Sequence, residues 1–589
     1  MRTARTVLLL TLSLTPCASS VAQGPRWVDS TLASLTLEEK VGQLFVAELV
    51  PLFTNEDDTA YRYALAMIRD YHVGTFILGG GNVLDIPIIT NKLQKASRVP
   101  LLINGDLEAG MTYMHPWRLS RGWTERLPKY IAGGGTQFPS QMAIGATGNP
   151  SYAFELGRIT GLEARAVGID WTNSPVADVN NNADNIIINT RSYGEDPALV
   201  ASMVDAYVRG ARSAGMIATL KHFPGHGDTR EDSHMQLPSL PFTLPRLDTV
   251  ELVPFRAGIA AGAQAVMTSH LALPAIDPSG RPATLSRSVI NGILRQRLGF
   301  GGIVVTDGMR MQGITDHFSS AEAAINALDA GVDAILAVAD IDSAFRGVVA
   351  AVRSGRLALK RIDESVRRIL EAKDWAGLSR SRTVSIDSIF RVVGARDFRA
   401  KAEEISDASV TLLRNTGNVI PLKPSMAVTV VAVSEDPQPQ TGIDLLEGVE
   451  PFVRSASLVR VSDETGSERF REISASAERS DVLVVGIYLS VVAWKGDRRF
   501  AGPLEDFLQS LGRLRVPVVT VAFGDPYVLG KIPLTQVVLT PFNGTVLAER
   551  SIARALTGRI RIAGKSPVTV PGRYRRGEGI VMEPVHRGG

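Results

Sequence analysis

The chain has 589 residues, 45% of them hydrophobic and 21% charged, and its formal net charge is only +3. This length allows two or three domains, and the composition is that of an ordinary globular protein. The basic residues are dispersed apart from a tail around 573–576, which argues against a nucleic-acid-binding protein.

Residues 1–22 have the pattern of a signal peptide: a basic start, an apolar stretch over 7–14, and small residues at 20 and 22. We therefore expect an exported chain, periplasmic or extracellular. Cys17 is a candidate lipoprotein anchor, which Pro16 makes the less favoured alternative. Cleavage after Ala22 removes this single cysteine and so excludes disulfides and cysteine catalysis. No later stretch reaches the ~18 apolar residues of a membrane span, so stable membrane insertion is not expected.

From about residue 35 to 375, eight short apolar runs alternate with longer helix-like segments, after a capping-box pattern at 36–39. The predicted strands are Gln43–Val46, Thr75–Leu78, Pro100–Asn104, Ile169–Thr172, Ala218–Lys221, Ala265–Thr268, Gly302–Thr306 and Ala334–Val338. Such alternation predicts a parallel sheet, and eight repeats suit a (β/α)₈ TIM-like barrel, here over residues 23–376.

A polar segment over 377–409 is predicted to be a linker that contains a helix. Residues 410–589 are predicted to form a smaller α/β domain, an αβα sandwich. Its expected strands are Ala427–Val433, Asp481–Ile487, Val516–Phe523 and Gln536–Leu539. This half carries no nucleotide-binding loop, and no cofactor is expected.

Polar residues follow several barrel strands: Asp106, Lys221 with His222, Ser269 with His270, and Asp307. Barrel enzymes place their chemistry at these carboxyl ends. Asp307 follows a strongly apolar strand and precedes a glycine. It is either a nucleophilic carboxylate in the barrel mouth or a cap for the next helix.

Residues 221–234, KHFPGHGDTREDSH, gather three histidines and two aspartates in one loop. The two-residue spacing lets Asp232 receive an imidazole N–H of His234, which would fix the tautomer of a proton-transferring histidine. The alternative is a solvated pair without a function. A zinc site of these His and Asp residues is disfavoured, because Pro224-Gly225 breaks any helix that would align His222 with His226. We expect no metal.

The loop resembles the signature of the β-N-acetylglucosaminidase branch of glycoside hydrolase family 3. Supporting segments are 37–44, 138–147, 175–180, 191–197, 282–286 and 305–311, with weaker ones at 415–422 and 524–527. The resemblance implies a two-domain member with a barrel and a smaller sandwich.

Matched position by position, the resemblance implies that Asp307 is the nucleophile and His234 the general acid/base, with Asp232 as its partner. It also implies that Asp106, Arg191, Lys221 and His222 bind the hydroxyls of the non-reducing sugar. Donors on Lys and Arg combined with acceptors on Asp can fix one pyranose ring.

Two departures from the family pattern stand out. The usual Asp-x-Glu-Gly-Gly appears as Asp106-Leu107-Glu108-Ala109-Gly110, followed by an extended segment over 111–135 that includes Trp117 and Trp123. The usual Asp-Asp of the nucleophile strand is Asp307-Gly308. Sugar contacts beyond Asp106 are therefore not carried over from the first loop.

The resemblance implies retaining exo-hydrolysis of terminal β-linked N-acetylglucosamine, with a peptidoglycan-derived carbohydrate or muropeptide as substrate. Alternatives in the same family are a β-N-acetylglucosaminide phosphorylase, which an imidazole acid/base permits because it repels phosphate less than a carboxylate does, and a β-glucosidase. A catalytically silent cell-wall-binding protein is a third alternative. The oligomeric state is not predicted.

Overall fold

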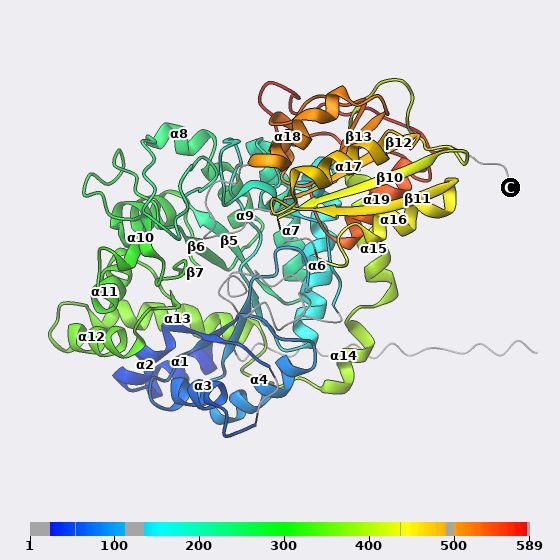
Figure 1. The fold of residues 1–589 in the computed structure, drawn as a ribbon. Coiled ribbons are helices and arrows are strands. Elements are labelled where there is room, and N and C mark those ends of the chain that lie inside the picture. Colours follow the sequence, from blue (N-terminus) through cyan, green and yellow to red (C-terminus); the bar gives the residue numbers. More distant parts are fainter. Residues whose placement is uncertain (1–23, 53–54, 112–134, 436–437, 490–499, 586–589) are drawn as a thin grey trace, which may run out of the picture.

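The computed structural model describes residues 24–52, 55–111, 135–435, 438–489 and 500–585. The predicted signal peptide and most of the 111–135 segment, including Trp117 and Trp123, lie outside these ranges. Two domains lie side by side: a large one, blue to green, and a smaller one, yellow to red (Figure 1). Within the described residues, no helix combines the length and the apolar character needed to cross a membrane.

The larger domain is an eight-stranded parallel barrel. The strands are β1 (Phe45–Leu49), β2 (Thr75–Leu78), β3 (Leu102–Gly105), β4 (Trp171–Thr172), β5 (Ile217–Phe223), β6 (Ala265–Thr268), β7 (Ile303–Val305) and β8 (Ile335–Leu336). They pair in chain order, and β8 pairs with β1. A parallel bridge from Val305 to Ala334 closes the ring between β7 and β8. The predicted (β/α)₈ fold is confirmed.

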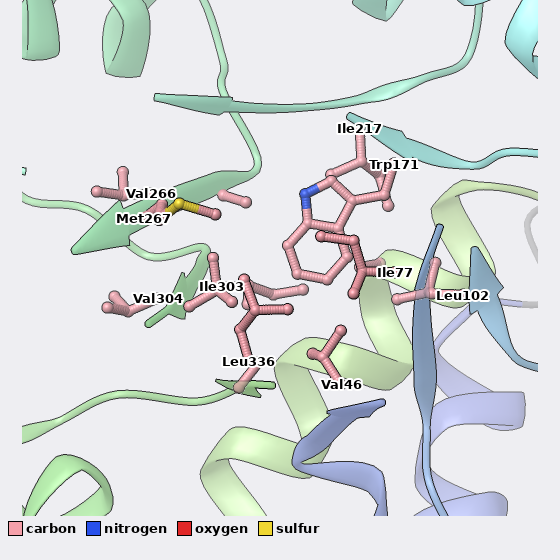
Figure 2. Close-up of a cluster of buried hydrophobic side chains, with 14 of the residues drawn as sticks. Val46, Ile77, Leu102, Trp171, Ile217, Val266, Met267, Ile303, Val304 and Leu336 are labelled. Carbon is pink, nitrogen blue, oxygen red and sulfur yellow. The ribbon is translucent and has the colours of Figure 1, made fainter. Parts of the chain in front are cut away.

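All eight strands contribute apolar side chains to the centre of the barrel (Figure 2). The indole of Trp171 lies among side chains such as Ile77, Ile217 and Ile303, and its ring N–H donates to the Thr219 hydroxyl at 2.6 Å. This packed interior explains why each predicted strand is short and apolar, since a barrel strand is buried on both faces.

Helices surround the barrel and connect its strands. They are α1 (Gly24–Ser34), α2 (Leu37–Gln43), α3 (Thr59–Arg69), α4 (Asp85–Ala96), α5 (Gln141–Ala146), α6 (Pro150–Ala166), η2 (Asn189–Arg191), α7 (Pro197–Ser213), α8 (Leu244–Thr249), α9 (Leu252–Ala260), η3 (Ala283–Leu285), η4 (Ser288–Arg297), α10 (Gln312–Thr315), α11 (Ser320–Ala330), α12 (Ile341–Arg353) and α13 (Leu359–Trp375). The predicted capping box is present at α2, where Thr36 accepts from the Glu39 N–H and the Glu39 carboxylate accepts from the Thr36 N–H.

Two helices, α14 (Ile386–Val392) and α15 (Arg396–Ser409), follow the barrel where the sequence predicts a linker that contains a helix. The second domain then contains β9 (Thr411–Asn415), β10 (Ala427–Ser434), α16 (Ile443–Val449), η5 (Glu450–Phe452), β11 (Ser455–Val461), α17 (Ser467–Ala477), β12 (Val482–Leu489), α18 (Gly502–Ser510), η6 (Leu511–Arg513), β13 (Val518–Gly524), η7 (Pro526–Gly530), β14 (Val537–Thr540) and α19 (Val546–Leu556).

The second sheet has six strands in the order β11-β10-β12-β13-β14-β9, with β9 antiparallel to β14. One face packs against apolar residues of α17 and α18, and the other against those of α16 and α19. The predicted αβα sandwich is therefore confirmed. The two edge strands β9 and β11 were not among the four predicted strands.

Candidate active site

The carboxyl ends of the barrel strands surround one cavity that is open to solvent. Six of the seven predicted site residues line it, namely Asp106, Arg191, Lys221, His222, His234 and Asp307. The seventh, Asp232, lies behind His234. The sequence places these residues up to two hundred positions apart, and the barrel brings their side chains to one rim, as the alternation of strands and helices requires.

Asp307 lies two residues beyond β7 and accepts a hydrogen bond from the Gly308 N–H at 2.7 Å. Burial alone would raise the pKa of its carboxyl. The imidazoles of His222, His270 and His234 and the Gly308 N–H outweigh that effect and hold the pKa well below its usual range. Asp307 is thus an ionised carboxylate at neutral pH. It caps no helix, because the next one, α10, begins after Met311.

His234 is oriented by Asp232, as their spacing predicts. The Asp232 Oδ1 atom accepts from the His234 backbone N–H at 2.8 Å and from its ring Nδ1 at 2.7 Å. The Asp232 side chain is 2% exposed and that of His234 is 20% exposed. Because the carboxylate accepts the Nδ1 proton, Nε2 is the nitrogen that can give or take a proton in the cavity.

His222 is held in the same way by a second buried carboxylate, Asp178, which the sequence did not identify as a site residue. Asp178 Oδ2 lies 2.7 Å from His222 Nδ1, and Asp178 Oδ1 accepts from the His226 backbone N–H at 2.7 Å. Burial opposes ionisation of Asp178, but the two imidazoles and the His226 N–H lower the pKa of its carboxyl below the usual value. The sequence feature that could have identified Asp178 is its position shortly after the carboxyl end of β4, where barrel enzymes place site residues.

The third histidine of the loop, His226, also lines the cavity, but both of its ring nitrogens have hydroxyl partners. His226 Nδ1 lies 2.7 Å from the Thr229 hydroxyl and Nε2 lies 2.9 Å from the Ser233 hydroxyl. The imidazole rings of the three histidines therefore bond to different side chains. Within the described ranges, no group of three or more His, Cys, Asp or Glu residues is arranged to hold a metal ion.

Arg191 and Lys221 share a carboxylate that the prediction left out, Glu108. Arg191 donates to it through Nε at 2.9 Å and Nη2 at 2.7 Å, and Lys221 Nζ lies 2.7 Å from its Oε1. Lys221 Nζ also donates to Asp106 Oδ1 at 3.2 Å. Burial alone would lower the pKa of Lys221, but Asp106 and Glu108 raise it, so the amine is charged. Two cations and two carboxylates form one network on this wall.

His270, beyond β6, supports the loop of Asp307. Its Nδ1 lies 2.9 Å from the Thr284 hydroxyl, and its Nε2 lies 3.1 Å from the Gly308 carbonyl oxygen. Burial lowers the pKa of His270, so the ring is neutral near pH 7. A carbonyl only accepts, so Nε2 carries the proton and fixes the peptide between Gly308 and Met309.

The opposite wall combines an ion pair with apolar side chains. Arg310 Nη1 donates to Glu48 Oε2 at 2.7 Å, and Ile77, Met311 and Leu336 lie around the pair. An apolar wall that faces a network of fixed donors and acceptors is suited to a sugar, which has apolar ring faces and an equatorial belt of hydroxyls.

Sequence comparison agrees with this geometry. The profile described as "Glycosyl hydrolase family 3 N terminal domain" matches residues 36–372. A "Beta-N-acetylglucosaminidase/beta-glucosidase" of Cellulomonas fimi is 30% identical over 567 residues, which cover 92% of this chain and 96% of that protein. "Beta-hexosaminidase A" of Pseudoalteromonas piscicida is 33% identical over 393 residues, 62% of each chain.

Solved structures are similar across both domains. A glycoside hydrolase family 3 β-N-acetylglucosaminidase from Paenibacillus sp. str. FPU-7 superposes with a TM-score of 0.80 and 32% identity, over 91% of this chain and 99% of that one. A β-glucoside phosphorylase, BglX, bound to 2FGlc gives a TM-score of 0.80 at 26% identity, over 93% and 96% of the two chains. The likeness thus includes the arrangement of barrel and sandwich.

Proposed function

This chain belongs to glycoside hydrolase family 3, and we propose that it is an exported, retaining exo-β-N-acetylglucosaminidase. The observation that carries the proposal is that an ionised Asp307 and a His234 oriented by a carboxylate line the same cavity. One group can attack carbon while the other moves a proton, which is what retaining hydrolysis needs.

In the first step, a carboxylate oxygen of Asp307 attacks the anomeric carbon, and the bond to the glycosidic oxygen breaks. Protonated His234 gives its Nε2 proton to that oxygen, and the aglycone leaves as an alcohol. The product is an ester between Asp307 and the sugar. In the second step, neutral His234 takes a proton from water as the water oxygen attacks the same carbon, and Asp307 leaves as a carboxylate.

The network of Asp106, Arg191 and Lys221, with His222 beside it, binds the hydroxyls at the non-reducing end. Asp178 accepts from His222 Nδ1, and His222 Nε2 lies 3.4 Å from Arg191 Nη2, which can only donate, so Nε2 is the acceptor of that contact. These groups are fixed before the sugar arrives, which lowers the cost of ordering them on binding. The carboxylates within the network let the cations act as donors without an unbalanced buried charge.

The natural substrate we propose is a peptidoglycan-derived carbohydrate or muropeptide ending in N-acetylglucosamine. Two considerations support it: the signal-peptide pattern of residues 1–22 and the β-hexosaminidase names of the relatives. An exported enzyme of this specificity meets cell-wall fragments outside the cytoplasm.

The decisive experiment is turnover of an aryl β-N-acetylglucosaminide by the wild type and Asp307→Ala. We expect a loss in kcat of at least about a thousandfold, because an alanine side chain at this position cannot form the ester. Asp316→Ala, an exposed carboxylate just beyond the same loop, is the matched control and should keep normal turnover. A mechanism-based fluorosugar should label Asp307. Near-normal activity of Asp307→Ala, or labelling of another residue, would reject the assignment.

Phosphorolysis is a second candidate, favoured by the imidazole acid/base and by Arg310 in the cavity wall. Neutral His234 does not repel phosphate as a carboxylate would, so phosphate could take the place of water in the second step. Product analysis with and without phosphate separates the two: free sugar under both conditions means hydrolysis. Parallel assays on an aryl glucoside test the β-glucosidase alternative.

A further inference from the structure

The loop that follows β4 runs between the active site and the second domain, and two buried asparagines of this loop bond to that domain. Asn180 Nδ2 donates to the Tyr527 hydroxyl oxygen at 2.7 Å, and Asn189 Nδ2 donates to Asp525 Oδ1 at 3.1 Å. Asn180, Asn189 and Tyr527 are 1%, 2% and 6% exposed. Asp525 and Tyr527 lie where β13 passes into η7, and Asp525 Oδ1 also accepts the Tyr527 N–H at 2.9 Å.

These contacts lead directly to Arg191 in the sugar-binding wall. Asn189 begins η2, the short turn whose last residue is Arg191. The backbone N–H of Asn189 donates to Asn180 Oδ1 at 3.0 Å, so the two asparagines are also tied to each other. Arg191 Nη1 then donates to the Ile187 carbonyl at 3.1 Å. Asp525 is therefore connected to the guanidinium of Arg191 by one hydrogen bond, from Asn189 Nδ2, and by the backbone of η2.

The backbone at Asn189 has a conformation that needs such support. Its φ is 40°, in the left-handed region that residues other than glycine rarely adopt, although asparagine does so more readily than most. Conformations of this kind persist where surrounding contacts determine them. At Asn189 those contacts are Asn180 from the barrel and Asp525 from the second domain.

We infer that Asp525 and Tyr527 are positioning residues of the sugar-binding subsite, through which the second domain fixes the place of Arg191. The inference rests on the proposed function, because it takes Arg191 to bind the sugar. Another contact between the domains bonds to the start of α7, beyond the turn that carries Arg191. There Arg576 Nη1 pairs with Asp196 at 2.6 Å.

The first test compares kcat/KM for an aryl β-N-acetylglucosaminide among single variants. Asp525→Ala should lower it about tenfold or more, because small displacements of a substrate-binding group carry large kinetic penalties. Asp525→Asn keeps an oxygen acceptor and should stay within about threefold of the wild type. Tyr527→Phe keeps the ring packing, loses the acceptor for Asn180, and should fall between the two. Arg576→Ala, which removes only the interdomain ion pair, should match the wild type.

A double-mutant cycle separates positioning from general loosening of the fold. In an Arg191→Ala background, Asp525→Ala should change kcat/KM by less than about twofold, because the group it positions is gone. Equal losses in both backgrounds would overturn the inference, as would full activity of Asp525→Ala. A wild type that does not turn over the substrate would instead reject the proposed function. Tyr527→Phe keeps the test valid should Asp525→Ala fail to fold.

Discussion

Three histidines lie within thirteen residues, and their hydrogen-bond partners give them three different tasks. His226 is buried between the hydroxyls of Thr229 and Ser233. His222 Nδ1 donates a hydrogen bond to Asp178, and His234 Nδ1 donates one to Asp232. A hydrogen bond at one ring nitrogen determines whether the other nitrogen can donate, accept or transfer a proton. His222 and His234 have a carboxylate at Nδ1 and therefore keep Nε2 for the cavity, whereas both ring nitrogens of His226 bond to hydroxyls.

Removal of His234 should affect substrates according to their leaving groups. A phenoxide needs a proton when it departs, whereas a dinitrophenoxide does not. We expect His234→Ala to lower kcat/KM about 10²- to 10⁴-fold for the phenyl glycoside and only several-fold for the dinitrophenyl glycoside. Azide, which attacks without a base, should restore kcat for the activated substrate and form a β-glycosyl azide. Equal losses on both substrates would contradict the assignment of His234 as the acid.

The buried His226 predicts a specific acid sensitivity of the fold. Burial and repulsion from His222 lower its pKa from 6.5 to about 4. Between these two values the unfolded chain binds a proton that the folded chain does not. The free energy of unfolding therefore falls as the pH drops through this window, and the contribution is fully present above pH 6.5.

His226→Gln removes that titration, so its Tm should fall less steeply than that of the wild type between pH 6.5 and 4. Thermal unfolding followed by circular dichroism at several pH values in this range would measure the two slopes. Parallel slopes would show that His226 titrates at the same pH in both states.

At the scale of elements, the loops after β4 and β5 are packed backbone against backbone. A Cβ atom added at Gly227 would lie 1.8 Å from the Val179 carbonyl oxygen. Asn185 Nδ2 donates to the His226 and Gly227 carbonyls at 2.8 and 3.0 Å, which holds the loops together. The position of His234 thus depends on a neighbouring loop as well as on its own strand.

Gly227→Ala should therefore displace the loop that carries Asp232 and His234. We expect a loss in kcat/KM of about a hundredfold together with a lower Tm, because the clash is with backbone and cannot be relieved by a rotamer change. Gly292→Ala is the matched control, since no atom lies within 4 Å of the added carbon and the position is helical. That variant should be active and at least as stable. Normal activity of Gly227→Ala would show that the loop adapts.

The elements that could be predicted from sequence are those whose signal is local. All eight barrel strands appear near their predicted places, because each is a short apolar run between helices. Strand β11, half exposed over Ser455–Val461, lacks that continuous apolar run, and the antiparallel edge strand β9 ends in Arg414 and Asn415. Neither pattern distinguishes an edge strand from a loop.

The same distinction applies to the site. The motif residues could be named from the sequence, and they meet in one cavity. Glu108 and Asp178 act on partners 83 and 44 residues away, and Asp525 lies 336 residues from Asn189. Such pairings depend on which loops the barrel brings together and on how the second domain docks, neither of which has a local pattern.

At the scale of the whole molecule, the two domains share a hydrophobic cluster. Met142, Ala143 and Ala146 of α5, a barrel helix, are fully or almost fully buried and belong to the same hydrophobic cluster as Phe542 and Tyr527 of the second domain. The Ser140 hydroxyl that begins α5 donates to the Phe542 carbonyl at 2.7 Å. At this place each domain buries apolar side chains of the other, so the free energies of unfolding of the two domains are coupled.

We expect the wild type to unfold in a single calorimetric transition, because separation of the domains would expose this apolar helix. Ala143→Glu places an unpaired charge in the shared cluster and should lower the Tm and split the transition in two. Ala60→Glu, on the exposed first turn of α3, is the control and should leave the transition unchanged. Two transitions in the wild type would show that the domains are independent.

The wall formed by Asp106, Glu108, Arg191 and Lys221 is electrically balanced before any ligand arrives. A neutral sugar that enters it exchanges hydrogen bonds with groups whose charges already cancel, and it displaces no counter-ions. Binding of a neutral sugar at this wall therefore depends on short-range geometry. Because the wall has no net charge for dissolved ions to screen, the affinity should change little with salt concentration.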